Sequence, residues 1–303
     1  METPAIQPEL RSKFTALYGA AGHEWIERFP NLLRSCIERW AVVEVGEPFG
    51  YVGYAWVAPV RLGGGSEAVL KLAPPDQEFA NEYHAMRLYG GNGAARLIDG
   101  DPAAVALLLE RLRPGTTLAD LGDDAEATGI GARAMADVFR PLPAEHTFPT
   151  LAQWGAAFER VRARHGGGCG GFPVDLFEPA QRIYFELCAS QEAPVLLHGD
   201  LHHWNILRAE RAPWLAIDPK GLAGERAFEP AAFLRNKADI AADATALARR
   251  RIAQMSGVLG VDAQRVLLWA FAGGVLGALW EFEDDGKVHE EHLVIARALR
   301  PLV

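Results

Sequence analysis

The sequence predicts an α+β protein of two lobes, a small lobe built on an antiparallel sheet and a larger, mainly helical lobe. The chain has 303 residues, more than one hydrophobic core usually takes, so two lobes are expected. Its first third alternates short apolar runs with turn residues, which is typical of strands. The remainder is mostly helical in pattern. We expect the lobes to cover residues 1–112, ending in a hinge, and 113–303, because Pro114-Gly115 indicates a bend.

The small lobe is expected to open with a helix and then to form strands. The pattern predicts a helix at about residues 9–29, strands at 40–45, 54–60, 68–72 and 105–109, and turns at 46–50 and 61–66. Between the last two strands, Pro74-Pro75-Asp76 begins a helix that runs to about Leu88. Gly90-Gly91 is its expected end.

The large lobe is expected to be helical around one strand-bearing segment. Helices are predicted at residues 124–140, 151–165, 178–191, 239–254, 263–282 and 289–299. The strands are predicted at 194–197, 206–207 and 214–217, the last two as a hairpin. Residues 266–280 form the most apolar run, too short to cross ~30 Å of hydrocarbon comfortably. Since this run carries three glycines, we expect a buried helix with close backbone packing.

Composition and charge favour some classes of partner over others. A net charge of −9 and an isoelectric point near 5.5 disfavour a nucleic-acid phosphate partner and are compatible with a cationic small molecule. The three cysteines form no C-x-x-C pair, which fits a reducing compartment. The first residues have neither a basic start nor an apolar core, so no secretory signal is visible. We expect a cytoplasmic protein with no membrane partner.

The segment His-Gly-Asp-Leu-His-His-Trp-Asn at residues 198–205 carries the strongest functional pattern. Asp200 stands five residues before Asn205, and Asp218 follows the apolar hairpin. Phosphoryl transfer from a magnesium nucleotide needs a carboxylate at the attacking hydroxyl, and an amide oxygen and a second carboxylate on the metal. The hairpin should bring Asn205 and Asp218 to its open end. The alternative is a loop of satisfied polar residues, which the strand context and the second aspartate disfavour.

Three further patterns in the sequence are weaker indications of function. Three histidines at 198, 202 and 203 could suggest zinc, but their spacing fits no common zinc site, so a loop-shaping role is favoured. The Gly-rich segment 165–171 lacks the Gly-Lys-Ser/Thr ending of a P-loop and is interpreted as a flexible linker. Residues 46–53 lie where a phosphate-covering loop would belong, but an ordinary hairpin explains them equally well.

Lys71 lies within a strand among aliphatic residues. Burying an ammonium without a partner is costly, so this side chain needs a carboxylate or a phosphate beside it. On the following helix, Glu82 shares the inward face of Phe79 and Met86 and is the preferred ion-pair partner. Glu78 is the fallback. The alternative is an exposed lysine at a strand end.

In chain order these residues follow the protein-kinase-like layout. In detail the sequence resembles the aminoglycoside phosphotransferase family, whose catalytic loop is similar to His-Gly-Asp-Leu-His-x-x-Asn. Within it the chain resembles the streptomycin 6-phosphotransferase branch, also described as aminoglycoside/hydroxyurea antibiotic resistance kinases. The similar segments are residues 70–75, 88–97, 108–115, 197–207 and 217–221. The resemblance runs from about Trp40 to Asn236.

This resemblance implies a bilobal protein-kinase-like fold with ATP in the cleft and two magnesium ions. Residues 1–112 would form the nucleotide-binding lobe and 113–303 the catalytic and acceptor-binding lobe. The resemblance implies that Asp200 is the base or the hydroxyl-orienting carboxylate, and that Asn205 and Asp218 are metal ligands. It implies that Lys71, braced by Glu82, contacts the phosphates. The backbone from Glu110 to Leu112 would contact the adenine. One departure is Asp218-Pro219-Lys220 in place of Asp-Phe-Gly, so no Phe-controlled switch or activation-loop regulation is expected.

The resemblance also implies the acceptor, the 6-hydroxyl of streptomycin, with antibiotic resistance as the outcome. A polycationic aminoglycoside needs carboxylates in its pocket, and Glu225, Glu229, Glu281 and Asp284 are candidates. Acids at a helix C-terminus cost roughly 0.3–1 kcal/mol each, so the acidic run 281–285 hints at a cationic partner, although it also fits a solvated helix end.

Two other functions remain open. The chain could be a kinase of this fold for hydroxyurea or another small metabolite, because fold similarity does not fix the acceptor. It could also be a nucleotide-binding protein that does not catalyse, which the intact set of site residues disfavours. The oligomeric state and the choice between ATP and GTP are left open by the sequence.

Overall fold

The computed structural model describes residues 4–50, 53–238 and 242–303 of the chain. The chain divides into two compact units, Met1–Gly115 and Thr116–Val303. The division falls after Gly115, at the segment in which the sequence predicts a bend. The assignment of nucleotide binding to one unit and acceptor binding to the other stays a prediction.

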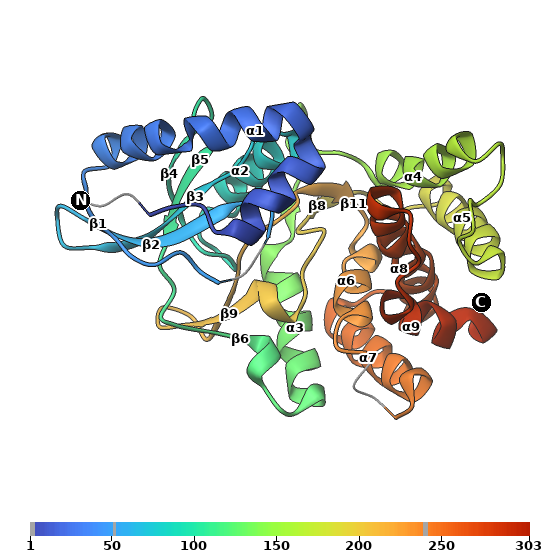
Figure 1. Cartoon of the computed structure of the whole chain (residues 1–303). Coiled ribbons are helices and arrows are strands. Elements are labelled where there is room, and N and C mark those ends of the chain that lie inside the picture. Colours follow the sequence, from blue (N-terminus) through green and yellow to red (C-terminus); the bar gives the residue numbers. More distant parts are fainter. Residues whose placement is uncertain (1–3, 51–52, 239–241) are drawn as a thin grey trace. The chain divides into compact units, whose positions relative to one another are not determined.

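Unit 1 is built on a five-stranded antiparallel sheet with the strand order β1-β2-β3-β5-β4 (Figure 1). Its strands are β1 (Val42–Val45), β2 (Trp56–Leu62), β3 (Glu67–Leu72), β4 (Leu97–Asp101) and β5 (Ala106–Glu110). Helix α1 (Pro8–Arg39) covers one face, where the cross-strand neighbours Ala58, Leu70 and Leu108 are buried in one core with α1 residues. Because side chains alternate along a strand, Lys71 belongs to the opposite face.

Helix α2 (Gln77–Tyr89) lies on that opposite face, and its ends follow from local sequence. The Asp76 side chain accepts a hydrogen bond from Phe79 N, which satisfies one of the N–H groups at the start of the helix. Gly90 ends the helix in the left-handed conformation, with φ of 56°. Both ends are close to those that the sequence predicts.

Two predictions in unit 1 were incomplete. Helix α1 continues through Pro30 to Arg39, and it is interrupted instead at Gly19, which has non-helical dihedral angles. The extension is stabilised by burial, since Leu33 and Cys36 pack into the core. Strand β4 was missed because Leu-Ile-Asp-Gly-Asp contains residues that disfavour strands. An edge position tolerates them, and there Asp99 accepts a hydrogen bond from Trp40 Nε1 at 2.8 Å.

Unit 2 is mainly helical, as predicted. Its helices are α3 (Asp124–Val138), α4 (Leu151–Arg164), α5 (Val174–Ala189), α6 (Pro230–Arg235), α7 (Ala244–Leu259), α8 (Ala263–Asp285) and α9 (Glu290–Leu299). Short 3₁₀ helices are η1 (Leu118–Asp120), η2 (His203–Asn205), η3 (Arg226–Phe228) and η4 (Arg300–Leu302). The sequence did not predict α6. The predicted start of α7 at Asp239 lies outside the described residues.

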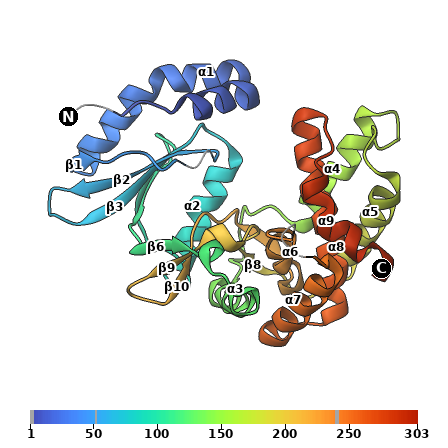
Figure 2. The same ribbon diagram turned by 60° about the horizontal axis from the view of Figure 1, so that its bottom comes forward.

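Helix α8 is the core helix of unit 2. It packs against α4, α5, α6, α7 and α9 (Figure 2). Within the part of the chain that the structure describes, α8 is the one helix long and apolar enough to cross a membrane, but 72% of its apolar window is buried inside the protein. The predicted buried helix is therefore confirmed, and the predicted close packing is found at Gly273 and Gly277 but not at Gly274.

The strands of unit 2 are short. β8 (Val195–Leu197) lies between β7 (Arg140–Pro141) and β11 (Leu222–Gly224) in an antiparallel sheet. β9 (Ile206–Ala209) and β10 (Trp214–Ala216) form the predicted hairpin, with Ile206 opposite Ala216. β6 (Pro114–Thr117) spans the division between the units. The loop between β8 and β9 contains Asp200 and Asn205.

Candidate active site

The catalytic loop begins with a turn that requires glycine. Gly199 has a φ of 84°, in the left-handed region that side chains rarely adopt. A Cβ atom at this position would also lie 3.0 Å from the ring of Trp154 and 3.3 Å from Leu222 Cβ. The chain therefore turns tightly at Gly199 and places Asp200 directly after the turn.

A buried carboxylate holds the start of this loop. Glu229 is 1% exposed, and it accepts hydrogen bonds from His198 N at 2.9 Å and Gly199 N at 3.1 Å. Burial raises the pKa of Glu229 to about 8, although the backbone N–H groups, including that of Leu201, act to lower it. Glu229 is thus a structural anchor of the loop, which corrects the prediction that it could contact the acceptor.

His198 connects the catalytic loop to the segment after β10. Its Nε2 lies 2.8 Å from Ile217 O, and its Nδ1 accepts from Asp200 N at 3.3 Å. Its own carbonyl oxygen accepts from Lys220 N at 2.9 Å and from Gly221 N at 3.2 Å. Burial lowers the pKa of His198 to about 4, so the ring is neutral at neutral pH. With both ring nitrogens engaged, this histidine shapes the loop, which is the role that the sequence predicts for it.

The structure brings Asn205 and Asp218 to the open end of one hairpin, as predicted. Ile217 N donates to Asn205 O at 2.9 Å, beyond the last pair of the β9–β10 ladder. Asn205 Nδ2 donates to the backbone oxygen of Asp200 at 3.0 Å, so Oδ1 is the side-chain atom that can ligate a cation. Asp218 has a φ of 60°, a left-handed conformation that is uncommon outside glycine and clusters at functional sites.

The side-chain oxygens of Asn205 and Asp218 could supply part of the ligand shell of a magnesium ion. Magnesium binds oxygen atoms, and it usually takes one or two protein carboxylates together with phosphate oxygens and water. Asp218 and Asn205 offer a carboxylate and an amide oxygen on adjacent strand ends. The described residues contain no group of three or more His, Cys, Asp or Glu placed to hold a metal. The two oxygen donors would suit an ion that takes its remaining ligands from nucleotide phosphates and water.

Among the described residues, the carboxylate of Asp200 lies beside the basic side chains of Arg235 and His202. Arg235 Nη2 lies 3.3 Å from its Oδ1, and His202 Nε2 lies 3.7 Å from its Oδ2, beyond hydrogen-bond distance. The side chain keeps 24% of its surface exposed. Asp200 can therefore accept a hydrogen bond from a hydroxyl group that reaches it from solvent.

In unit 1, Lys71 and Glu82 form the predicted ion pair. Lys71 Nζ lies 2.8 Å from Glu82 Oε1 and 2.7 Å from Oε2, and the two side chains are 12% and 8% exposed. The preferred partner of Lys71, Glu82, is therefore confirmed. Because desolvation offsets much of the attraction in a buried pair, this pair is weak evidence for stability. It leaves one ammonium fixed on the sheet face covered by α2.

The predicted adenine contacts lie at the end of unit 1. Glu110 ends β5, and its Oε2 accepts from Arg96 N at 2.9 Å, while Leu112 is 6% exposed. Their role toward a nucleotide stays a prediction. In the predicted phosphate-covering loop, Tyr51 and Val52 lie outside the described residues.

The prediction that Glu225 contacts the acceptor is corrected by the structure. Glu225 is 1% exposed, and its carboxylate accepts hydrogen bonds from Arg265 Nε at 2.8 Å, from Trp269 Nε1 and from Glu192 N at 3.1 Å. Both oxygens are therefore occupied inside the core of unit 2. Glu225 links α8 to the segment after α5 and does not face solvent.

The acidic end of α8 lies at the surface and is partly neutralised. Glu281 pairs with His292, and Glu283 accepts two hydrogen bonds from Arg160 at 2.9 and 2.7 Å. Asp285 lies 2.9 Å from His289 Nε2. Asp284 is exposed. Glu281 and Asp284 remain candidates for acceptor contact, within a cluster that already attracts basic groups.

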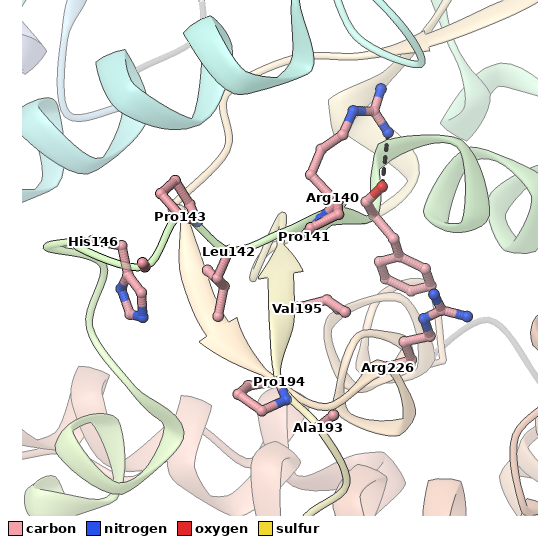
Figure 3. Close-up of a pocket in the computed structure, with 11 residues that line it drawn as sticks. Arg140, Pro141, Leu142, Pro143, His146, Ala193, Pro194, Val195 and Arg226 are labelled. Carbon is pink, nitrogen blue, oxygen red and sulfur yellow. Dashed lines mark hydrogen bonds between the residues drawn. The ribbon is translucent and has the colours of Figure 1, made fainter.

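A cavity of about 490 Å³ opens elsewhere in unit 2 (Figure 3). Its lining includes Leu142, Pro194 and Val195, and Arg140 Nη1 at its edge donates to Phe139 O at 2.8 Å. Val195 is the first residue of β8, whereas the catalytic loop follows the last one. The cavity therefore lies at the opposite end of this strand from Asp200 and contains none of the predicted site residues.

Sequence reasoning missed the contacts that Glu229 and Arg235 make with the catalytic loop. Glu229 lies in the otherwise apolar segment Ala-Phe-Glu-Pro-Ala, residues 227–231. A single acid in an apolar segment could have indicated a buried carboxylate. Arg235 follows Phe233-Leu234 at the end of α6, and nothing in its local sequence points to Asp200.

A buried histidine follows Asp200 in this loop and is expected to make folding sensitive to acid. His203 is 1% exposed and stacks on Phe233 with ring centroids 3.8 Å apart, and neither ring nitrogen has a hydrogen-bond partner among the described residues. Burial lowers the pKa of His203 to about 3. The unfolded chain, with a histidine pKa near 6.5, binds more protons, so this contribution to stability is lost as the pH falls below about 6.5.

We expect His203→Leu to weaken the acid dependence of unfolding. Leucine has a similar volume and cannot be protonated, so the slope of unfolding free energy with pH between 4.5 and 6 should fall by about 1.4 kcal/mol per pH unit at most. Urea unfolding at several pH values measures this slope. His84→Leu, in unit 1, is the control. An unchanged slope in His203→Leu would show that the ring is protonated in the folded state.

Comparison with known proteins identifies the family. The family model for aminoglycoside/hydroxyurea antibiotic resistance kinases matches residues 39–286. A streptomycin 6-kinase of Streptomyces glaucescens is 34% identical over 97% of both chains, and a hydroxyurea phosphotransferase of Kitasatospora aureofaciens is 34% identical over 99% of this chain and 86% of its own. The solved aminoglycoside phosphotransferase APH(3'')-Id of Streptomyces rimosus, with ADP and streptomycin, superposes with a TM-score of 0.53 at 17% identity, covering 82% of this chain and 97% of its own. This likeness confirms the predicted protein-kinase-like α+β fold, and the family match with the two full-length relatives shows that the chain belongs to the aminoglycoside/hydroxyurea antibiotic resistance kinases.

Proposed function

We propose that this protein transfers the γ-phosphate of ATP to the 6-hydroxyl of streptomycin and thereby confers resistance to it. The observation that carries the proposal is the joining of Asp200, Asn205 and Asp218 through one loop and one hairpin end. These groups supply an accessible carboxylate and two cation ligands, which phosphoryl transfer from a magnesium nucleotide requires. We place the reaction in the cytoplasm, where ATP is available, and the three free cysteines agree with a reducing compartment.

In the proposed reaction Asp200 acts on the acceptor. Its carboxylate accepts a hydrogen bond from the acceptor hydroxyl and directs that oxygen at the γ-phosphorus. The new O–P bond forms as the bond from the γ-phosphorus to the β–γ bridging oxygen breaks, ADP leaves with the electron pair, and the hydroxyl proton passes to the carboxylate. Such a group typically contributes ~10²–10⁴-fold to the rate.

The remaining site residues would hold the nucleotide. Asn205 Oδ1 and the Asp218 carboxylate would hold magnesium, which when bound neutralises phosphate charge. Lys71, fixed by Glu82, would donate to the phosphates. The backbone between Glu110 and Leu112 would meet the adenine edge.

The choice of acceptor rests on charge and on similarity. Streptomycin carries guanidinium groups, which favour bidentate contacts with carboxylates, and Glu281 and Asp284 are surface carboxylates of unit 2. The net charge of −9 also favours the approach of a cation. Similarity over nearly the whole length to a protein named streptomycin 6-kinase supports this acceptor over kanamycin-type aminoglycosides.

We expect incubation with Mg-ATP to add one phosphate to the streptidine ring of streptomycin and none to kanamycin. Mass spectrometry of the product gives the added mass, and its fragments locate the phosphate on one ring. The Asp200→Asn variant is the control for enzymatic origin. A phosphate on another ring, or on a different aminoglycoside in preference, would contradict the proposed acceptor and leave the phosphotransferase assignment intact.

Hydroxyurea is the second candidate acceptor. The hydroxyurea phosphotransferase relative is as similar in identity as the streptomycin 6-kinase. Hydroxyurea is small and neutral, so its phosphorylation would not depend on surface carboxylates. Including it in the same assay, with wild type and with Glu281→Gln, separates the two: activity on hydroxyurea alone, unchanged in the variant, would select this second function.

We expect Asp218→Asn and Asn205→Ala to shift the magnesium requirement upward. Asp218→Asn removes a negative charge from a hard-cation site and Asn205→Ala removes an oxygen ligand, and both ligand charge and ligand number set the affinity for the ion. The measurement is initial rate against magnesium concentration at fixed ATP. Asp243→Asn, at the N-terminus of α7, is a control with a helix-capping aspartate outside the site. Wild-type titration curves in both site variants would remove these residues from the metal site.

A further inference from the structure

We infer that Arg235 is a positioning residue for the carboxylate of Asp200, and that Gly277 in α8 provides the space in which its guanidinium group does this. The inference rests on the proposed function in one respect, that Asp200 is the carboxylate that meets the acceptor hydroxyl. It adds two residues that lie outside the catalytic loop and the segment of Asp218, on the helices α6 and α8.

The contact between Arg235 and Asp200 is direct. Arg235 ends α6, and its Nη2 lies 3.3 Å from Asp200 Oδ1, with 26% and 24% of the two side chains exposed. The His202 ring lies 3.7 Å from Oδ2, beyond hydrogen-bond distance, and burial lowers its pKa, which disfavours the charged form of the ring. The guanidinium group of Arg235, which is always charged, therefore contacts this carboxylate directly. By holding Oδ1, it leaves Oδ2 to accept the acceptor hydroxyl.

Gly277 determines where this guanidinium can lie. A Cβ atom on Gly277 would lie 2.2 Å from Arg235 Nη1 and 3.0 Å from its Cζ. Real Cβ atoms do not approach other atoms so closely, so one of the two groups must move. Helix α8 is packed on several sides by other helices, whereas the guanidinium is the end of a flexible side chain. A methyl group at 277 would therefore displace Arg235 and leave the helix in place.

The energetic consequence is unusual for a core substitution. Glycine in a helix interior is about 0.5–1 kcal/mol less favourable than alanine, so Gly277→Ala should not lower stability. Its effect should fall on the reaction, because a displaced guanidinium no longer orients Asp200. Misplacement of a reacting group by about 1 Å can cost about 10²-fold in rate.

Gly274 offers a matched control on the same helix. A Cβ atom there would meet Ala296 Cβ at 3.9 Å, an ordinary van der Waals contact. Gly274→Ala therefore makes the same change of backbone propensity without touching Arg235.

The experiment compares Gly277→Ala, Gly274→Ala, Arg235→Ala and the double variant Arg235→Ala/Gly277→Ala. In Gly277→Ala we expect an unfolding midpoint at or above that of wild type, a kcat lowered about 10- to 100-fold and little change in the KM of ATP. Gly274→Ala should keep the wild-type kcat. Because Gly277 is inferred to act through Arg235, adding Gly277→Ala to Arg235→Ala should lower kcat no further.

Crystal structures of the two glycine variants make the inference testable apart from the acceptor. Arg235 Nη2 should be beyond hydrogen-bond distance of Asp200 in Gly277→Ala and within it in Gly274→Ala. An unmoved Arg235, an unchanged kcat, or equal losses of kcat in the wild-type and Arg235→Ala backgrounds would each overturn the inference. If the wild-type protein transferred phosphate to no acceptor, the proposed function would be overturned instead. The two crystal structures would still decide whether Gly277 controls the contact between Arg235 and Asp200.

Discussion

Asp200→Asn is expected to lower kcat with the acceptor by ~10²–10⁴-fold and to leave the Kd of ATP nearly unchanged. The amide cannot take the hydroxyl proton, and it presents two N–H donors where the carboxylate presents acceptors. The metal ligands should be unaffected, because Asn205 donates to the backbone oxygen of Asp200 at 3.0 Å and not to its side chain. Steady-state kinetics together with equilibrium binding of ATP separate these two effects.

Asp137→Asn is a suitable control for this substitution. Asp137 lies on α3 in the same unit, and its side chain is exposed. It should keep wild-type kcat and wild-type binding of ATP. If Asp200→Asn also retained near-wild-type turnover at saturating acceptor, another group would have to orient the hydroxyl.

The parts of the site that could be predicted are those whose geometry is set by local sequence. Asn205 and Asp218 meet because a short hairpin joins them, and a hairpin is visible as two apolar runs around a turn. Lys71 and Glu82 meet because strand alternation and helical spacing each fix one face. In both cases the sequence pattern determines which way the side chains point as well as which residues they are.

The parts that could not be predicted depend on partners far along the chain. Glu225 looked available to a ligand, yet Arg265 and Trp269 of α8 enclose it. Arg235 can lie beside Asp200 because Gly277 has no side chain in that space. No regular sequence spacing relates residues 235 and 277. Strand β4 forms despite its glycine and aspartates because β5 supplies hydrogen-bond partners on one side. Tertiary packing overrides local preference at each of these positions.

Glu229→Ala is expected to have the second-largest effect, on stability and on activity together. The substitution leaves the buried N–H groups of His198 and Gly199 without their acceptor, at a cost of roughly 1–3 kcal/mol each. The start of the catalytic loop would then lose its fixed position, so kcat should fall as well. Urea unfolding and steady-state kinetics measure the two effects. Glu159→Ala, an exposed glutamate on α4, should change the unfolding free energy by less than about 0.5 kcal/mol.

Glu229 should also give the protein a characteristic loss of stability on the alkaline side. Burial raises its pKa from 4.5 to about 8, so between these values the folded state holds a proton that the unfolded state has released. The contribution to stability is therefore complete below pH 4.5 and is lost as the pH rises through about 8, with a slope of at most about 1.4 kcal/mol per pH unit.

Glu229→Gln isolates this contribution, because glutamine keeps an acceptor oxygen and does not titrate. The comparison is cleanest between pH 6.5 and 8, since the pKa values of His198 and His203 are lowered to about 4 and about 3 and both histidines are neutral there in the folded state. Over this range the unfolding free energy of wild type should fall relative to that of Glu229→Gln. A constant difference between the two proteins would mean that Glu229 is already ionised at pH 6.5, and that the backbone N–H groups of the catalytic loop outweigh its burial.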